Sequence, residues 1–454
     1  MKKKIAVLLA AAMMASLTAC GGGSSETSTT AEGKTESKAE SKETTAGGAA
    51  EGGEKTLTVS WWGNQVRNER TQAILDLYSE QNPGVVFDGQ FSEWNDYWNK
   101  LATAAAGHSM PDIVQMDYKY LQQYVSNGLL LDLTPYIEDG TLKVDDCNEG
   151  VLNSGKVGDG IYAICNGINA PALMYNKTVL DEAGITVKDN MTLEEFYDVC
   201  RQVYEKTGYK TNVLYGQNET LMEYLLRADD IIMWGDGTKL GGTAEDYVSY
   251  FQIYENGLKE GWLLDPSVFA ERTIGSVEQD PLVYGSSPET MSWCMLQHTN
   301  QLTAVRSAAP EGTEIGITTW PSPNPAKSNY LKPSQFFAVT TDSKNPEEAA
   351  KVIDFITNSE ECNNILLGER GIPLSSKVSE AIKPNMDETS QEIITFINEV
   401  VSPASSQINP PAPDAVGEVQ DRINKLEEQV CYGQMTGEEA GNQFFEEANA
   451  ILSK

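Results

Sequence analysis

The chain is poor in histidine and in positive charge. Its 454 residues hold two histidines, and 33 Lys and Arg stand against 66 Asp and Glu, which gives a net charge of −33. Two histidines disfavour a histidine-rich metal site, and we expect no metal and no other cofactor. Because an acidic surface repels phosphate backbones, we expect no nucleic acid as a partner.

Cysteine is scarce as well and follows no pattern. After Cys20 the cysteines are scattered singly, without the close pairs that mark zinc sites or redox motifs. We therefore expect mostly buried thiols and no disulfide framework. They are Cys147, Cys165, Cys200, Cys294, Cys362 and Cys431. Several catalytic signatures are also missing: there is no Gly-x-Ser-x-Gly, no His-Glu-x-x-His and no phosphate loop.

The first twenty residues have the features of an export signal. Three lysines at 2–4 precede an apolar run at 5–14, which is too short to span a membrane permanently. The sequence Leu-Thr-Ala-Cys-Gly at 17–21 resembles the lipobox of bacterial lipoproteins, in which the cysteine is lipidated and becomes the new N-terminus. We expect a signal peptide at 1–19 and lipid, palmitate included, on Cys20. The alternative is an ordinary signal peptide with an incidental cysteine.

A low-complexity segment follows Cys20. From 21 to 54 there is no aromatic residue and no Leu, Ile or Val. Such a segment cannot bury enough apolar surface to offset its chain entropy, so residues 20–54 are predicted to be a lipidated, disordered tether. Removing 1–19 leaves 30 positive against 66 negative side chains, a net charge of −36. We attribute that acidity to solubility outside the cell rather than to a particular ligand.

Behind the tether, strand patterns alternate with helix patterns. Strands are predicted at 57–62, from 85 and at 112–116, and the helices that follow them end at 82–83, Gly107 and Gly128. This alternation indicates βαβ units and a mainly parallel sheet. The fold class is therefore α/β.

Several segments, in this order, resemble the extracellular solute-binding proteins of ABC-type sugar importers, the family 1 solute-binding proteins. Each segment alone is a weak signal, and their order behind a lipobox and a tether is a strong one. They are residues 57–62, 110–114, 128–133, 160–164, 173–177, 180–184, 345–356 and 371–373.

The resemblance implies two Rossmann-like lobes joined by hinge strands, of the type II periplasmic-binding-protein kind, with the ligand in the interlobe cleft. Lobe 1 would comprise 55–165 plus 321–375, and lobe 2 would comprise 166–320 plus 376–454. The chain would cross between the lobes near 165–171, 320–334 and 371–378.

The implied function is to bind an oligosaccharide outside the cell and deliver it to ABC permease subunits driven by a separate ATPase. Such a carrier performs no covalent chemistry, so no catalytic residue is expected. We expect a monomer at the cell surface, held to the outer face of the cytoplasmic membrane through its lipid anchor only.

A sugar presents apolar C–H faces and a rim of hydroxyls, so aromatic rings, amides and charged groups at strand ends are the candidate contacts. The candidates are Trp61, Trp62, Asn64, Glu93, Trp94, Asp117, Tyr118, Asn166, Asn169, Trp234, Asp236, Trp293, Trp320, Gln335 and Arg370.

Some of these candidates have an equally plain structural interpretation. Alternation along a strand points Trp61 and Trp62 to opposite sides, and we favour Trp62 in the cleft. Asp117 could cap the helix behind it, and Asp236 could be a turn residue. Two further residues, Trp98 and His298, are predicted to be structural.

Three other functions remain open at this point. A secreted glycoside hydrolase also needs carboxylates near aromatic rings, and 66 acidic residues could supply a pair. A surface adhesin would bind a protein partner instead of a small ligand. A binder of peptides or polyamines on the same fold is compatible with the acidic surface.

Overall fold

A computed structural model describes residues 54–216 and 219–454, which belong to one compact unit. The predicted signal peptide, Cys20 and the tether up to residue 53 lie outside the described residues. Among the described residues, no helix combines the length and the apolar character that a membrane span requires.

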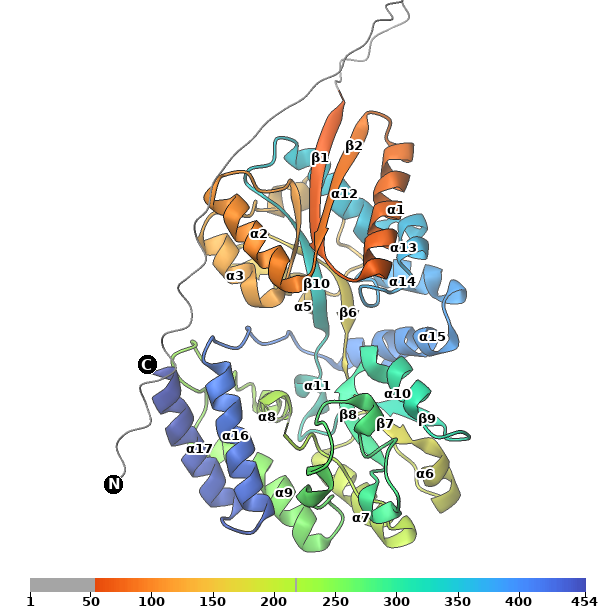
Figure 1. Cartoon of the computed structure of the whole chain (residues 1–454), viewed down its shortest axis with the longest axis vertical. Helices are drawn as coiled ribbons and strands as arrows, with labels where there is room; N and C mark the ends of the chain where they lie inside the picture. Colours follow the sequence, from red (N-terminus) through yellow and green to blue (C-terminus); the bar gives the residue numbers. More distant parts are fainter. Residues whose placement is uncertain (1–53, 217–218) are drawn as a thin grey trace, which may run out of the picture. The chain divides into compact units, whose positions relative to one another are not determined.

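The first sheet has five strands in the order β2-β1-β3-β10-β6 (Figure 1). Strand β1 runs parallel to β2 and β3, while β10 runs antiparallel to β3 and β6. The sheet is therefore mixed rather than mainly parallel, because β10 belongs to a chain segment that returns from the second sheet. The bounds are β1 (Lys55–Trp62), β2 (Val85–Ser92), β3 (Ile113–Met116), β6 (Ile164–Asn169) and β10 (Lys332–Val339).

Three predicted helices connect and flank these strands. They are α1 (Gln65–Gln81), α2 (Trp94–Ala106) and α3 (Tyr118–Ser126). Each begins directly behind the carboxyl end of a strand, so the first turns of all three lie at the same edge of the sheet (Figure 1).

The second sheet has the order β8-β7-β9, and its neighbouring strands are antiparallel. Two isolated parallel bridges, Lys210 to Ser292 and Thr211 to Leu263, extend it beyond β8. From the bridges through β8 and β7 to β9, the second sheet has two parallel pairings followed by two antiparallel pairings. The first sheet has the same order of pairings from β2 to β6, so the two lobes share one architecture. The bounds are β7 (Pro171–Asn176), β8 (Cys294–His298) and β9 (Ile315–Thr318).

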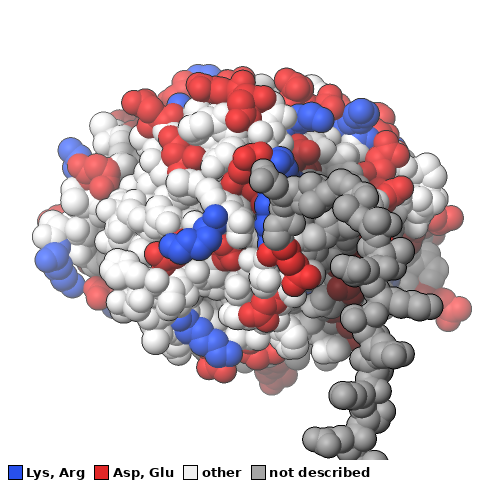
Figure 2. Space-filling view, turned by 90° about the horizontal axis from the view of Figure 1, so that it is seen from above, with Lys and Arg blue, Asp and Glu red and all other residues white. Residues whose placement is uncertain are grey.

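The other elements fill the faces and edges of the two sheets. In chain order they are α4 (Thr134–Glu138), α5 (Glu149–Leu152), β4 (Lys156–Val157), β5 (Gly160–Ile161), α6 (Lys177–Ala183), α7 (Leu193–Thr207), α8 (Glu219–Leu226), α9 (Val248–Glu260), α10 (Leu302–Ala308), α11 (Pro325–Ser328), α12 (Pro346–Asn358), α13 (Glu360–Leu366), α14 (Ser376–Ile382), α15 (Glu388–Thr395), α16 (Val416–Cys431) and α17 (Gly437–Leu452). Figure 2 shows acidic side chains spread over the viewed face with basic ones among them.

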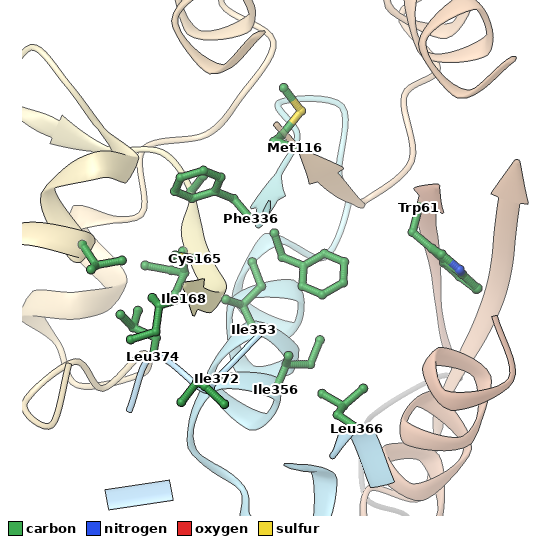
Figure 3. Packing of buried hydrophobic residues seen from close by; sticks show 14 of the residues in the cluster. Trp61, Met116, Cys165, Ile168, Phe336, Ile353, Ile356, Leu366, Ile372 and Leu374 are labelled. Atoms are coloured by element: carbon green, nitrogen blue, oxygen red, sulfur yellow. The ribbon is translucent and has the colours of Figure 1, made fainter. Parts of the chain in front are cut away.

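Buried side chains form two hydrophobic clusters. The first surrounds the five-stranded sheet, and Figure 3 shows Phe336 of β10 in it with Ile353 and Ile356 of α12. The second joins α7, α9, α16 and α17 to the second sheet. Residues 378–401 bury apolar side chains in the first cluster, which also includes Met174, Met295 and Ile315 of the second sheet. Helix α15 bonds to lobe 2 as well, because Arg306 donates to Thr389 Oγ1 at 3.0 Å and to Glu392 Oε2 at 2.6 Å.

Three chain segments connect the first sheet and its helices with the second sheet and its helices. The first joins β6 to β7 through Ala170, and the second covers 319–331 between β9 and β10. A crossing near 371–378 stays a prediction; we call residues 402–415, ahead of α16, the third connection, because Ser402 contacts Asn148 and Asn409 contacts Arg227. Residues 371–372 stay with the first sheet, because Ile372 bridges to Ile168 of β6.

Candidate binding cleft

A cavity of about 570 Å³ lies where the three connecting segments meet the carboxyl ends of β3 and β8. Strand and helix ends from both lobes supply its walls, and the third connection supplies two apolar residues. Open α/β sheets bind ligands at this place. The lining residues are Asp117, Tyr118, Lys119, Asn169, Gln297, His298, Asn300, Gln301, Lys332, Pro333, Ser334, Ile408 and Pro411.

Two smaller hollows adjoin this cavity. One, of about 400 Å³, shares Asn169, Asn300 and Ser334 with it and is also lined by Gln335 and Arg370. The other, of about 350 Å³, lies in lobe 2 and shares Gln297 and His298 with the main cavity. Its further lining residues are Leu214, Gly216, Thr220, Leu296, Trp320, Gln420 and Asn424.

The polar groups of the main cavity are mostly uncharged. Amides come from Asn169, Gln297, Asn300 and Gln301. Burial, with the neighbouring positive charge of Lys332, lowers the pKa of His298 to about 3, so its imidazole is neutral at physiological pH. Neutral amides both donate and accept hydrogen bonds, which suits hydroxyl groups.

Lobe 1 contributes the start of α3. The Asp117 carboxylate caps this helix by accepting a hydrogen bond from the Lys119 backbone N–H at 2.9 Å, and burial raises the pKa of that carboxyl. The Tyr118 hydroxyl donates to the Asn409 carbonyl oxygen at 3.1 Å, and burial raises its pKa to about 12. Both side chains are therefore held in place before any ligand arrives.

An aromatic platform includes Tyr120, which directly follows the cavity residues Asp117, Tyr118 and Lys119 in the chain. It consists of Trp62, Trp94, Trp98 and Tyr120, with ring centroids 4.9 Å apart for Trp62 and Trp94 and 4.3 Å apart for Trp98 and Tyr120. Trp94 is 39% exposed and the other three rings are half-buried. Trp98, predicted to be core, packs against the first cluster and also contacts Trp94 and Tyr120.

The structure brings several predicted residues together. Asp117, Tyr118 and Asn169 line the main cavity, and Trp320 lines the lobe 2 hollow. Trp62 and Trp94 belong to the platform. Gln335 and Arg370 line the hollow of about 400 Å³, but their polar atoms bond inside the protein. Gln335 Nε2 donates to the Arg370 carbonyl oxygen at 2.7 Å, and the Arg370 guanidinium donates to Gln115 and Thr71.

Four predicted tryptophans are buried, so in this structure their rings offer little surface to a ligand. Trp61 and Trp320 are 1% exposed, Trp234 is 2% exposed and Trp293 is 0% exposed. Trp61 points to the covered side of β1, where its indole N–H donates to the Asn68 side chain at 2.9 Å. Trp293 lies in the second cluster with its N–H bonded to Thr211 Oγ1 at 2.8 Å.

Four polar candidates do not line the main cavity, and two of them have local structural roles. Asn64 caps α1, and Asp236 is exposed and closes a turn with the Thr238 N–H at 3.0 Å. Glu93 is exposed at the start of α2. Asn166 is buried in β6, and neither atom of its amide has a partner among the described residues.

Sequence reasoning missed most of the wall supplied by lobe 2. Gln297 and His298 end β8, a position that the apolar pattern at 294–296 could have indicated. The third connection had no such signal, because its place depends on contacts far apart in the chain. Among the described residues, no group of three or more His, Cys, Asp or Glu is placed to hold a metal.

Comparison with known proteins identifies the class of protein that this fold and cleft define. The family model described as bacterial extracellular solute-binding protein matches residues 73–391, and the chain belongs to this family. Members of the family act outside the cytoplasm.

Particular relatives agree in fold. The chain is 26% identical to an extracellular solute-binding protein family 1 from Alicyclobacillus acidocaldarius, with a TM-score of 0.79 over 88% of this chain and 99% of that one. A periplasmic oligogalacturonide binding protein from Yersinia enterocolitica is 19% identical, with a TM-score of 0.72 over 88% and 99% of the two chains.

An arabinooligosaccharide-binding protein of Halalkalibacterium halodurans is 25% identical over 111 residues. That match spans 24% of this chain and 24% of the relative.

Proposed function

We propose that this protein binds an oligosaccharide and delivers it to the permease subunits of an ABC importer, which a separate ATPase drives. One observation carries the proposal: the cavity is lined mostly by uncharged polar groups and by the first residues of α3, and the next residue of that helix, Tyr120, belongs to a platform of tryptophan and tyrosine rings. A ring that buries on the order of 60–80 Å² contributes roughly 1.5–2 kcal/mol. A few such faces and hydrogen bonds reach micromolar affinity.

The names of the relatives support a sugar. One binds arabino-oligosaccharides and another binds oligogalacturonides, as their names say. A carrier of this kind performs no covalent chemistry and releases the sugar unchanged.

The lobes close around the sugar by a population shift between open and closed forms. Lobe 1 comprises 55–165 and 321–375, and lobe 2 comprises 166–320 and the C-terminal helices.

The carrier is a monomer on the outer face of the cytoplasmic membrane. After removal of residues 1–19, lipid on Cys20 forms the anchor and residues 21–54 form the tether. Replacing Cys20 with Ala should release the protein from washed membranes, while a variant that stays membrane-bound would contradict the anchor.

Calorimetry on the compact unit from Gly52 tests the sugar assignment. The probes are arabino-oligosaccharides, digalacturonic acid and cycloalternan, one neutral and linear, one acidic and one cyclic. Saturable binding with intact sugar recovered supports the carrier. Shortened products would indicate a glycoside hydrolase, and binding of peptides or spermidine alone would move the substrate outside the carbohydrates.

A further inference from the structure

The third connection, residues 402–415, forms a strap between the lobes. Ile408 and Pro411 of the strap line the main cavity. Lobe 1 holds the strap near its start, where Asn148 Nδ2 donates to Ser402 Oγ at 3.1 Å. Four prolines stiffen the segment, so its position is set by a few fixed contacts.

One buried guanidinium makes most of the strap's side-chain contacts with lobe 2. Arg227, at the end of α8, is 4% exposed. Its Nη1 donates to Asn409 Oδ1 at 2.8 Å, and its Nη2 donates to Ser406 Oγ at 2.6 Å and to the Gln407 carbonyl oxygen at 2.9 Å. Since a guanidinium only donates, these bonds fix the orientation of the Asn409 amide.

Arg227 also holds the second connection. Its Nε donates to the Ser328 carbonyl oxygen at 2.9 Å, and its guanidinium lies 4.9 Å from the centre of the Tyr330 ring. The Tyr330 hydroxyl in turn lies 3.3 Å from His298 Nε2. This path ends at a cavity residue of lobe 2.

A second path from Arg227 ends at a cavity residue of lobe 1. Asn409 accepts from Arg227 through its side chain and from the Tyr118 hydroxyl through its backbone carbonyl. One strap residue is therefore held from both lobes, and the two cavity walls meet at it.

We infer that Arg227 is a positioning residue for sugar binding: it sets the strap wall of the cavity and, through Asn409 and Tyr330, the groups at Tyr118 and His298. The inference rests on the proposed function, in which this cavity holds the sugar. Arg227 itself does not line the cavity.

Arg272 provides a matched control in the same lobe. It too donates to main-chain carbonyls, of Tyr284 at 2.9 Å and of Thr290 at 3.0 Å, and it lies 5.1 Å from a tyrosine ring centre. It touches neither the strap nor the cavity. Arg227→Gln should weaken binding of whichever sugar probe the unchanged protein binds by about tenfold or more, whereas Arg272→Gln should stay within about twofold.

A double-mutant cycle separates positioning from a general loss of stability. Tyr118→Phe removes the hydroxyl that holds Asn409 and keeps the ring. Because both groups act through Asn409, Arg227→Gln combined with Tyr118→Phe should bind within about twofold of Arg227→Gln alone, while Arg272→Gln and Tyr118→Phe should act additively. Additive losses in both pairs would overturn the inference.

Hydrogen exchange without sugar gives a second readout. In Arg227→Gln, the backbone amides of the strap, and that of Ser406 above all, should exchange faster than in the unchanged protein. In Arg272→Gln their exchange rates should equal those of the unchanged protein. If Arg227→Gln does not fold, Asn409→Ala removes the strap side of the contact and should give the same loss of affinity. If no probe binds the unchanged protein, the proposed function fails and exchange alone decides: faster exchange confined to the strap supports the role of Arg227, and equal exchange overturns it.

Discussion

At the residue scale, burial decides which aromatic side chains can meet a ligand. Eight tryptophans occur in the sequence, and their identity alone does not separate those in the platform from those in the cores. Alternation along β1 did predict that Trp61 and Trp62 differ in burial, because successive side chains of a strand point to opposite faces of the sheet. Trp234 lies in a glycine-rich, loop-like sequence, yet contacts distant in the chain bury it.

Trp94 is the platform residue whose removal tests the site most cleanly. Trp94→Ala should weaken sugar binding by about tenfold, because the ring covers on the order of 60–80 Å² of sugar. Its exposure predicts little change in the melting temperature. Calorimetry and a thermal melt measure the two effects.

Phe91 is the control, since it is 55% exposed in the same lobe but lies on β2 against Trp61, outside the platform. Phe91→Ala should keep the affinity of the unchanged protein. Equal losses for Phe91→Ala and Trp94→Ala would remove the platform from the site.

Asp280 gives lobe 2 a stability that depends on pH. Burial raises the pKa of this carboxyl to about 7, against the opposing effects of the hydrogen bond from the Leu282 N–H and the positive charge of Arg272. An unfolded chain has an Asp pKa near 3.9. Between these values the folded state holds a proton that the unfolded state lacks, so the contribution is complete below about pH 4 and is lost as the pH rises through about 7.

Asp280→Asn should remove this dependence, because the amide keeps an acceptor for the Leu282 N–H and cannot ionise. Between pH 5 and pH 8 the unchanged protein should lose unfolding free energy relative to Asp280→Asn, by on the order of 3 kcal/mol. Urea titrations at both pH values measure it, and parallel curves for the two proteins would refute the assignment.

At the element scale, short-range sequence signals set where some helices begin. Capping boxes form at Thr192 with Glu195 and at Thr436 with Glu439, and each is completed within four residues. The third connection, at 402–415, has no such local signal. Helix α15 buries apolar side chains in the first cluster and bonds to Arg306 of α10, and such partners lie far away in the sequence.

The hinge strand β6 depends on a close backbone approach that only glycine allows. A Cβ at Gly167 would overlap the Arg370 carbonyl oxygen and come within 2.8 Å of Ser334 Oγ. Gly167→Ala should therefore force the 370–372 segment away from the sheet and lower the melting temperature by several degrees, as a cost of about 1–3 kcal/mol implies.

Gly417 in α16 is the matched control, because a Cβ there meets no atom within 4 Å. Gly417→Ala should hold or raise stability by up to about 1 kcal/mol, since alanine loses less conformational freedom in a helix. A Gly167→Ala variant as stable as Gly417→Ala would show that the approach is not tight in solution.

At the scale of the whole molecule, the sequence predicted the class of fold and not the completed cleft. Ordered motifs along the chain indicated two lobes, and the family match agrees. The cleft is built from strand ends of both sheets and from the strap, so its lobe 2 wall follows from the pairing of β7 with β8 and β9. No local pattern encodes that pairing.

Closure of the two lobes is the behaviour that the cleft should produce. A ligand shifts an equilibrium only by its differential affinity for the two forms. The platform belongs to lobe 1 alone, so we expect it to contact sugar in the open form, whereas we expect Gln297 of lobe 2 to reach a sugar on the platform only after closure. Saturating sugar should therefore lower the radius of gyration, roughly 21 Å for a compact chain of this size, by on the order of 1 Å.

Two variants divide affinity from closure. Trp94→Ala removes a contact present in both forms, so at saturating sugar it should compact as far as the unchanged protein, although more sugar is needed. Gln297→Ala removes a contact made only in the closed form, so it should compact less even at saturation. Small-angle scattering across a sugar titration reads both quantities at once: the midpoint gives the affinity and the plateau gives the closure. Identical plateaus for the two variants would mean that lobe 2 does not take part in holding the sugar.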